Sequence, residues 1–410
     1  MANYRYTKAI AGSCAIGIGL GVVRFDFAVV GRLMIESGLF SASSIGELSS
    51  LNLAGYILGC LHHSQLRILR DRRVTLWIAL LTIPISLFAE GLSSALAMHA
   101  FWRILAGWAS GHLMSGIPHL ATLGCADGQR RRASALVMAG AGIGALIGAL
   151  SVGSLPMETV ELGWMVLGTV AAVLAIPVGW LLLVGFRDEA RHDPEAPLAR
   201  GEAPKIPASS LLPLAALTLG YLLLGAGQTP VALYEPLLVS ERLGASPMLS
   251  STSLAVFGAG CTTGSLLAST FPRRWPTVVL LPIVACLGLL GNILFLTGSS
   301  ATILGAATFC VGAWIWLTAS LTFDRLSQLV DPSELRPTWS LITMILGIGF
   351  ALFAFATSPL VSQHIDGLIL IGVVVVVLQV IAELIQWLGD RRHRHPDEAN
   401  SLRFPGGSEI

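Results

Sequence analysis

Long apolar stretches separated by short polar gaps run through nearly the whole chain. Each stretch is long enough to cross a hydrocarbon core of about 30 Å, which takes roughly 20 helical residues. Because lipid offers no partners for open backbone groups, stretches of this kind are expected to be helices. The pattern predicts twelve membrane spans, at residues 8–30, 45–66, 74–94, 97–125, 133–155, 163–186, 209–239, 249–271, 277–297, 301–323, 338–359 and 366–388.

The polar segment 187–208 divides the chain in the middle. It carries four prolines and alternating charges, which is typical of an exposed linker. Six predicted spans lie on each side of it. The pattern therefore predicts an N-terminal six-helix bundle at 1–186, the linker, a C-terminal six-helix bundle at 209–390 and a polar tail at 391–410. Two such bundles are expected to be pseudo-symmetric about an axis along the membrane normal, with a site between them near mid-membrane.

Basic residues fall in every second gap, so that 21 of the 25 lysines and arginines lie on one side of the predicted membrane. Positive loops resist translocation, which predicts that both termini and the linker are cytoplasmic. The preference for Arg over Lys is typical of a bacterial protein, so the bacterial inner membrane is the expected location. The charged fraction of 12% argues against a soluble protein, and the net charge of +1 gives no indication of a nucleic-acid partner.

Two sequence segments resemble known transporters. The segment FWRILAGWASG at 101–111 contains an R-x-x-x-G-x-x-x-G pattern that is similar to the fourth helix of the major facilitator superfamily. The segments GVVRFDF at 21–27 and SLNLAGYILG at 50–59 resemble the YbfB/YjiJ-like branch, whose members are mostly transporters of unknown substrate. The resemblance implies an all-α membrane protein with twelve transmembrane helices in two pseudo-symmetric six-helix bundles.

Two arginines lie inside predicted spans, Arg24 in the first and Arg103 in the fourth. An ionisable residue within a span costs about 2.5–3.5 kcal/mol on insertion scales, so it tends to face a cavity or another helix. Two guanidinium groups at similar depth could bind one anionic group. The alternative is that each arginine pairs with Asp26 or extends to the interface. Asp26 lies about 200° around the helix from Arg24, so the two do not share a face.

Histidines His112 and His119 are seven residues apart in the fourth span, which places them on one helix face. A regular helix puts that face opposite Arg103. Histidine titrates near physiological pH and could relay protons, as could Asp26. The alternative is that each ring is satisfied by a neighbouring carbonyl group. No further Cys, Asp or Glu completes a metal-binding set, and the six cysteines show no paired spacing, so no metal site is expected.

The seventh span carries Tyr221, Gln228 and Glu235 at intervals of seven residues. Such spacing forms one polar stripe about 21 Å long on a helix. A stripe of this depth suits a wet cavity better than lipid, so we expect it to line a substrate path, with Glu235 as a candidate proton-coupling carboxylate. The alternative is that Glu235 already lies at the membrane interface.

Three further features mark candidate positions. Asn52, Tyr56 and His63 share one face of the second span, where substrate contact and helix–helix hydrogen bonding are both expected outcomes. Trp314 could supply an aromatic wall in the tenth span, or simply pack there. Glycines repeat every fourth residue at 140–148, similar to the glycine-rich fifth helix of exporters.

These features predict a secondary transporter that moves a small solute by alternating access and is coupled to protons or another ion. They favour an anionic or polar organic substrate and export. Two alternatives stay open. One is a membrane sensor or scaffold that keeps the fold without transport, and the other is an intramembrane enzyme. The sequence contains no phosphate-binding loop and no catalytic motif of the His-Glu-x-x-His or Gly-x-Ser-x-Gly type, so neither cofactor nor catalytic residue is expected.

Overall fold

Helices make up nearly all of the computed structural model, which describes residues 2–153, 160–192, 208–244, 247–272, 275–357 and 365–401. The described ranges contain no β-strand. Apolar runs of membrane-spanning length explain this architecture, because a helix satisfies every backbone group within its own segment.

The first half of the chain forms one bundle. Its elements are α1 (Ala2–Ile16), η1 (Gly17–Phe25), α2 (Phe27–Glu36), α3 (Ala42–Gln65), α4 (Leu69–Gly91), α5 (Leu96–Thr122), α6 (Asp127–Gly153) and α7 (Val160–His192). The first predicted span is therefore three segments, because the π-helix η1 interrupts the α-helical pattern between α1 and α2. The other five spans each correspond to one helix.

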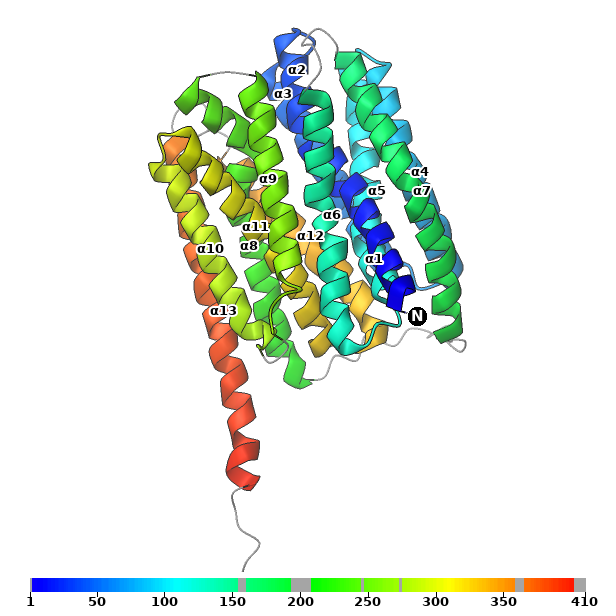
Figure 1. The fold of residues 1–410 in the computed structure, drawn as a ribbon, viewed down its shortest axis with the longest axis vertical. Coiled ribbons are helices and arrows are strands. Elements are labelled where there is room, and N and C mark those ends of the chain that lie inside the picture. Colours follow the sequence, from blue (N-terminus) through cyan, green and yellow to red (C-terminus); the bar gives the residue numbers. More distant parts are fainter. Residues whose placement is uncertain are drawn as a thin grey trace, which may run out of the picture.

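The second half forms the other bundle. Its helices are α8 (Ala208–Leu243), α9 (Pro247–Leu267), α10 (Thr277–Thr297), α11 (Ala301–Leu329), α12 (Pro332–Thr357) and α13 (Ile365–Ser401). We call the end of the molecule where α7 ends and α8 begins the linker face, which lies at the bottom of Figure 1. Helix α7 continues beyond residue 186 to His192, and the rest of the predicted linker lies outside the described residues. Helix α13 extends past the other helices at the linker face (Figure 1).

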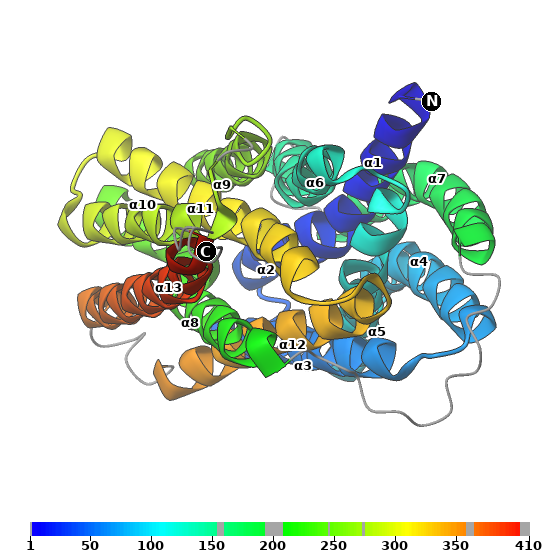
Figure 2. The same cartoon turned by 90° about the horizontal axis from the view of Figure 1, so that it is seen from below.

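The two bundles repeat the same packing. In the first, α3 packs on α5, α4 on α7, and η1 on α6; in the second, α9 packs on α11, α10 on α13, and α8 on α12. The two most extensive contacts between the bundles are the crossings of α6 with α9 and of α3 with α12, which occupy equivalent places in the repeat, and smaller contacts join α6 with α11 and α5 with α12. Figure 2 looks along the helices from the linker face and shows the two groups side by side.

Nine segments of the described chain are long and apolar enough to cross a membrane. They are Tyr6–Glu36, Leu69–Gly91, Gln129–Gly153, Val160–Arg191, Ser210–Glu235, Thr277–Thr297, Ala301–Leu329, Pro332–Thr357 and Asp366–Asp390. The described part of α9, Thr252–Leu267, is a shorter apolar helix. Helices α3 and α5 fall below the same measure of apolarity, because they carry the polar residues from which the candidate site is built.

Candidate functional site between the two bundles

The π-helix η1 lies in the first bundle and brings Arg24 to its contact with the second. Its glycines allow very close packing on α6: a Cβ atom at Gly21 would lie 2.6 Å from the Gly144 Cα atom. The Asp26 N–H donates to the Gly21 carbonyl at 3.2 Å, five residues back. Insertions of π-helix are rare and frequently occur at functional sites. The segment GIGLGVVRF is thus a π-helix, and it changes the directions of the side chains next to the charged residues of the first span.

The Arg24 guanidinium stands between aromatic rings of both bundles. Its central carbon lies 4.5 Å from the centroid of the Phe350 ring on α12 and 6.0 Å from that of Tyr56 on α3. The side chain is half-buried, and among the described residues no carboxylate pairs with it. Cation–π contact stabilises a guanidinium without using its N–H donors, which lie in the plane of the guanidinium group and stay available for hydrogen bonds. An anionic group of a ligand could therefore bind Arg24 without displacing a protein partner.

Arg103 has different neighbours. It is buried in the first bundle, donates from Nη1 to the Val23 carbonyl at 2.9 Å and lies 3.9 Å above the Phe27 ring. Asn52 on α3 donates from Nδ2 to the Arg103 carbonyl, also at 2.9 Å. These contacts hold the first helix, α3 and α5 together. The structure therefore does not turn the two arginines toward one ligand, and Asn52 forms the helix–helix hydrogen bond that was its alternative role.

Two buried carboxyl groups of the first bundle lack hydrogen-bond partners among the described residues. Both oxygens of Asp26 are in this state, and so are both oxygens of Glu90 on α4. Asp26 lies directly against α6, where a Cβ atom at Gly148 would meet its Oδ2 at 1.6 Å. The described residues contain no Asp26–Arg103 ion pair. An unpaired carboxylate is costly in an apolar contact, whereas a neutral carboxyl group is tolerated.

The polar stripe of the seventh span is buried along its whole length, at Tyr221, Gln228 and Glu235. Glu235 accepts a hydrogen bond from the Thr308 hydroxyl on α11 at 3.4 Å. Tyr221 lies near the linker face, with its ring 5.9 Å from that of Trp339. The stripe therefore faces other helices at its two ends.

Trp314 packs inside the second bundle. Its ring leaves no room for a Cβ atom at Gly288 on α10, which would lie 2.2 Å away, and it also approaches Gly227 on α8. The side chain is fully buried. Packing between α8, α10 and α11 thus accounts for Trp314.

The histidines of the fourth span enter two clusters near the linker face. His112 contacts His62 and His63 on α3, each at 3.1 Å between ring nitrogens. His119 lies 3.7 Å from the Glu189 carboxylate on α7. The three rings meet because of the way α3 lies along α5, which the sequence alone does not predict.

Polar contacts close the gap between the bundles at the linker face. On one side, Arg131 of α6 pairs with Asp324 of α11 at 2.9 Å and donates to the Thr277 hydroxyl at 2.8 Å. On the other side, α12 donates to the backbone of the first bundle, through Arg336 to the His63 and Leu66 carbonyls, Trp339 to the Met114 carbonyl and Ser340 to the Cys60 carbonyl. All of these residues lie in the half of their helices nearest the linker face. The structure is thus closed at that face.

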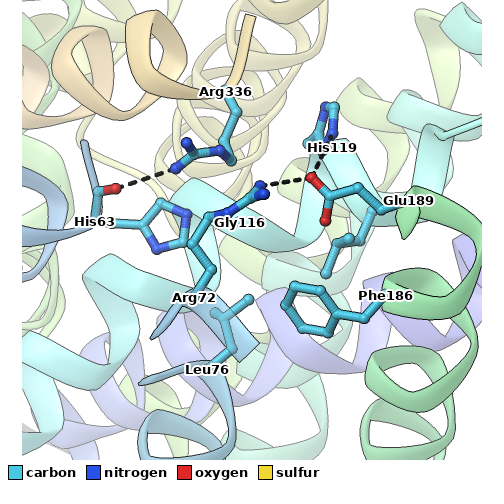
Figure 3. A pocket seen from close by; sticks show the side chains of 9 residues that line it. His63, Arg72, Leu76, Gly116, His119, Phe186, Glu189 and Arg336 are labelled. Atoms are coloured by element: carbon cyan, nitrogen blue, oxygen red, sulfur yellow. Dashed lines mark hydrogen bonds and ion pairs between the residues drawn. The ribbon is translucent and has the colours of Figure 1, made fainter. Parts of the chain in front are cut away.

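A small pocket lies within this closed region (Figure 3). Its charged and titratable lining residues are His63, Arg72, His119, Glu189 and Arg336. Arg72 donates to Glu189 at 2.5 Å, and Arg336 reaches in from the second bundle. The sequence marks these arginines only as topological charges, because they lie at span ends; Glu90, by contrast, carries the same signal as Arg24, an ionisable residue inside a span.

Comparisons with known proteins identify the fold. Residues 16–387 match the family described as "Uncharacterised MFS-type transporter YbfB". The human organic anion transporter MFSD10 (TETRAN) superposes with a TM-score of 0.68 at 16% identity, covering 93% of this chain and 99% of that one. The proton:xylose symporter XylE, bound to 6-bromo-6-deoxy-D-glucose, gives 0.69 at 15% identity, covering 92% and 94%. A comparison with curated protein sequences gives no match. The two structural likenesses confirm the predicted all-helical two-bundle fold.

Proposed function

We propose, because this chain belongs to the family of YbfB-like major facilitator transporters, that it moves a small organic anion across the membrane by alternating access. Family and fold point to a membrane transporter rather than an enzyme. The resemblance stated from the sequence is confirmed at that level. The substrate, the coupling ion and the direction are the parts that we propose.

Arg24 carries the proposal of an anionic substrate. It lies where the two bundles meet, it is near aromatic rings from both, and among the described residues its guanidinium, unlike that of Arg103, has no hydrogen-bond partner. A planar guanidinium matches a carboxylate or phosphate with two parallel hydrogen bonds. A solute bound there would touch Tyr56 of one bundle and Phe350 of the other, so its binding would depend on their relative position.

Closure at one face supports the alternating mechanism. The hydrogen bonds and the ion pair that join the bundles gather at the linker face, where α12 and α6 contact the opposite bundle. We propose that this face is cytoplasmic, as the distribution of basic residues predicts. The structure then corresponds to the state closed toward the cytoplasm. Rocking of the two bundles would break these contacts and form others at the opposite face.

Proton coupling is assigned to Asp26. Its carboxyl group is buried two residues from Arg24, at the junction between η1 and α2, and has no hydrogen-bond partner among the described residues. Gain or loss of a proton there would change the charge beside η1. The position of the Arg24 side chain would change with it. Glu235 is a less direct candidate, because its carboxyl group accepts from Thr308 inside the second bundle.

The anion site is tested by replacing Arg24 with Gln in protein reconstituted in liposomes. A thermal-shift screen with small carboxylates, phosphates, sugars and amines first identifies stabilising solutes. We expect anions among them, and we expect Arg24→Gln to weaken their binding about 100-fold, because one bidentate charged contact is lost. Arg24→Lys should retain part of the affinity, since it keeps the charge without the planar geometry.

Arg32→Gln is the matched control, because Arg32 pairs with Glu36 near the far end of the same helix. It should bind and transport the anion as the unchanged protein does. Equal anion affinity in Arg24→Gln would contradict the assigned site. A screen in which only neutral solutes stabilise the protein would contradict the substrate class.

A further inference from the structure

Three histidines form a continuous chain where α3 crosses α5. His62 Nδ1 lies 3.1 Å from His112 Nε2, and His63 Nδ1 lies 3.1 Å from His112 Nδ1. The two outer rings stand nearly edge-on to the central one, with interplanar angles of 88° and 70°. A neutral imidazole has one donor and one acceptor nitrogen. His112 therefore bridges its neighbours through both of its nitrogens.

The two ends of the chain differ in their surroundings. The His62 side chain is exposed on the outer surface of α3, where the Trp108 ring stacks on it at 6.0 Å. His63 is fully buried, and its Nε2 atom has no hydrogen-bond partner in the described part of the chain. His63 also lines the pocket at the linker face (Figure 3). The chain thus connects the exterior of the first bundle with this pocket.

A metal ion would need a different geometry. Ligand nitrogens have to converge on one point, whereas both nitrogens of His112 are directed at other rings. No group of three metal-binding side chains was found among the described residues. A row of imidazoles joined nitrogen to nitrogen is instead suited to passing a proton from ring to ring.

The pocket holds a group that could receive the proton. Glu189 is the only carboxylate among the described lining residues, and its Oε2 atom is buried with no hydrogen-bond partner within the described ranges. Its Oε1 atom accepts from Arg72 and lies 3.7 Å from His119. The cavity volume of about 10 Å³ is close to the roughly 10–15 Å³ that a single water needs. Because His63 and Glu189 line the same pocket, water in it offers the step from the ring to the carboxylate, past the Arg72 side chain (Figure 3).

The charge balance of the pocket depends on Glu189. The guanidinium groups of Arg72 and Arg336 both line it, and the carboxylate of Glu189 pairs with Arg72 on the side away from Arg336 (Figure 3). Arg67, Glu334 and the three chained histidines are the other titratable groups that act on Arg336 or His63. Protonation of Glu189 would leave two arginines facing each other without a counter-charge. Their repulsion would weaken the hold of Arg336 on the His63 and Leu66 carbonyls, and thereby the closure of the linker face.

We propose that His62, His112 and His63 are a proton relay that lets the outer surface of α3 exchange protons with Glu189 while the linker face is closed. A proton added to His62 at Nε2 displaces the Nδ1 proton to His112 Nε2. The Nδ1 proton of His112 then passes to His63, which releases its Nε2 proton into the pocket. One proton enters and one leaves, each ring changes tautomer, and the reverse transfer restores the chain. This inference rests on the proposed alternation between two states.

The test follows opening of the linker face after a sudden pH drop in purified protein in nanodiscs. The Trp339 indole donates to the Met114 carbonyl across the bundles at 3.0 Å, so the fluorescence component that Trp339→Phe removes reports closure. The pH is lowered from about 8 to about 3.5, because the contacts of Glu189 with Arg72 and His119 keep its carboxylate ionised in milder acid. We expect the unchanged protein to open rapidly. His112→Phe should reach the same final signal at least about tenfold more slowly, because only the path is lost.

Two further variants separate the relay from its target. Glu189→Gln should show the open signal at both pH values, because it carries no negative charge. His62→Gln interrupts the relay at its exposed end and carries the same expectation as His112→Phe if that variant fails to fold. His99→Gln is the control. His99 lies on α5, as His112 does, but it is bonded to the Ser93 carbonyl and is not part of the histidine relay. Its variant should open at the unchanged rate.

The outcomes are distinct. If Glu189→Gln is open while His112→Phe and His62→Gln open at the unchanged rate, the relay is overturned, and only the role of Glu189 in closing the linker face remains. A Glu189→Gln variant that stays closed and still responds to pH overturns the choice of Glu189. If the Trp339 signal never changes in any variant, the alternation itself fails, and the proposed function falls together with this inference.

Discussion

The two crossings that join the bundles occupy equivalent places in the repeat but are built from different chemistry. Where α6 crosses α9, a Cβ atom at Gly142 would lie 2.3 Å from the Gly258 carbonyl oxygen, and one at Gly258 would lie 2.8 Å from that of Gly142. Where α3 crosses α12, side chains of α12 donate to carbonyl groups, for example Ser340 to Cys60 at 2.6 Å. The first crossing is mainly backbone against backbone, with one side-chain hydrogen bond from Ser265 to the Ala135 carbonyl at 2.8 Å, and the second is a set of several hydrogen bonds.

The difference indicates that the two crossings have different roles although the backbone repeat is symmetric. Backbone contact through glycines allows two helices to pivot at that point, because no side chain separates Gly142 from Gly258. Hydrogen bonds donated by Arg336, Trp339 and Ser340 must be broken when the bundles separate, and their strength can be adjusted by nearby charge. We therefore assign the pivot to α6–α9 and the adjustable closure to the contacts of α12 with α3 and α5.

The largest effect is expected from Gly142→Ala, which disturbs the pivot. The added methyl group would overlap backbone atoms of α9, which cannot move aside as a side chain can. Overpacking of this kind costs about 1–3 kcal/mol, so the closed population should fall by up to about 100-fold. The measurement is double electron–electron resonance between spin labels at the exposed Arg70 and Thr270, in a background without the six native cysteines.

Gly305→Ala is the matched control, because a Cβ atom at Gly305 on α11 meets nothing within 4 Å. It should leave the label distances unchanged and stabilise the helix slightly, by up to about 1 kcal/mol. If Gly142→Ala leaves the distances as they are, α6–α9 is not the tight pivot that the comparison requires.

A smaller effect is expected from Arg336→Ala, which weakens the adjustable crossing. The variant loses two hydrogen bonds donated by a charged group, to His63 at 3.2 Å and to Leu66 at 2.9 Å. The freed carbonyl groups lie at the end of α3 and can bind water, so we expect a loss of about 1–2 kcal/mol and an approximately tenfold shift toward the open linker face. The same spin-label distances measure the shift.

Arg325→Ala removes an equal charge at the same face without touching the crossing. Arg325 pairs with Asp390 and Gln328, both in the second bundle. Its replacement should leave the closed population unchanged. An equal shift in the two variants would mean that net charge at the linker face, rather than the contact with α3, controls closure.

The sequence predicts the fold well because the fold follows from hydrophobic runs. Each predicted span corresponds to helical residues, including α5, whose span was recognised although it contains Arg103 and three histidines. What the runs do not reveal is backbone irregularity: nothing in GIGLGVVRF distinguishes a π-helix from a glycine-rich α-helix. That irregularity sets the direction of Arg24 relative to Asp26.

The site is predicted only in part, because burial and partner choice depend on helix register. Arg24 and Asp26 were found by the cost of charge inside a span. Arg336 was counted as a topological charge, since a residue at a span end gives the same signal whether it faces water or caps α3. His112 was recognised as a relay candidate, but its partners His62 and His63 follow from the crossing of α3 with α5.

The smallest effect on closure is expected from Asp26→Asn, which touches neither crossing. Asp26 lies inside the first bundle against Gly148, so the spin-label distances at the linker face should not change. Its carboxyl group has no partner among the described residues, and the isosteric amide cannot exchange a proton. We therefore expect loss of pH-gradient-driven accumulation in liposomes with retention of solute exchange at equal pH.

Glu383→Gln is the control, because Glu383 is also a buried carboxyl group against a glycine, Gly220, but lies in the second bundle, away from Arg24. Accumulation that persists in Asp26→Asn would remove Asp26 from the coupling mechanism, and a change in the distances would show that the first helix, as well as the two crossings, sets closure.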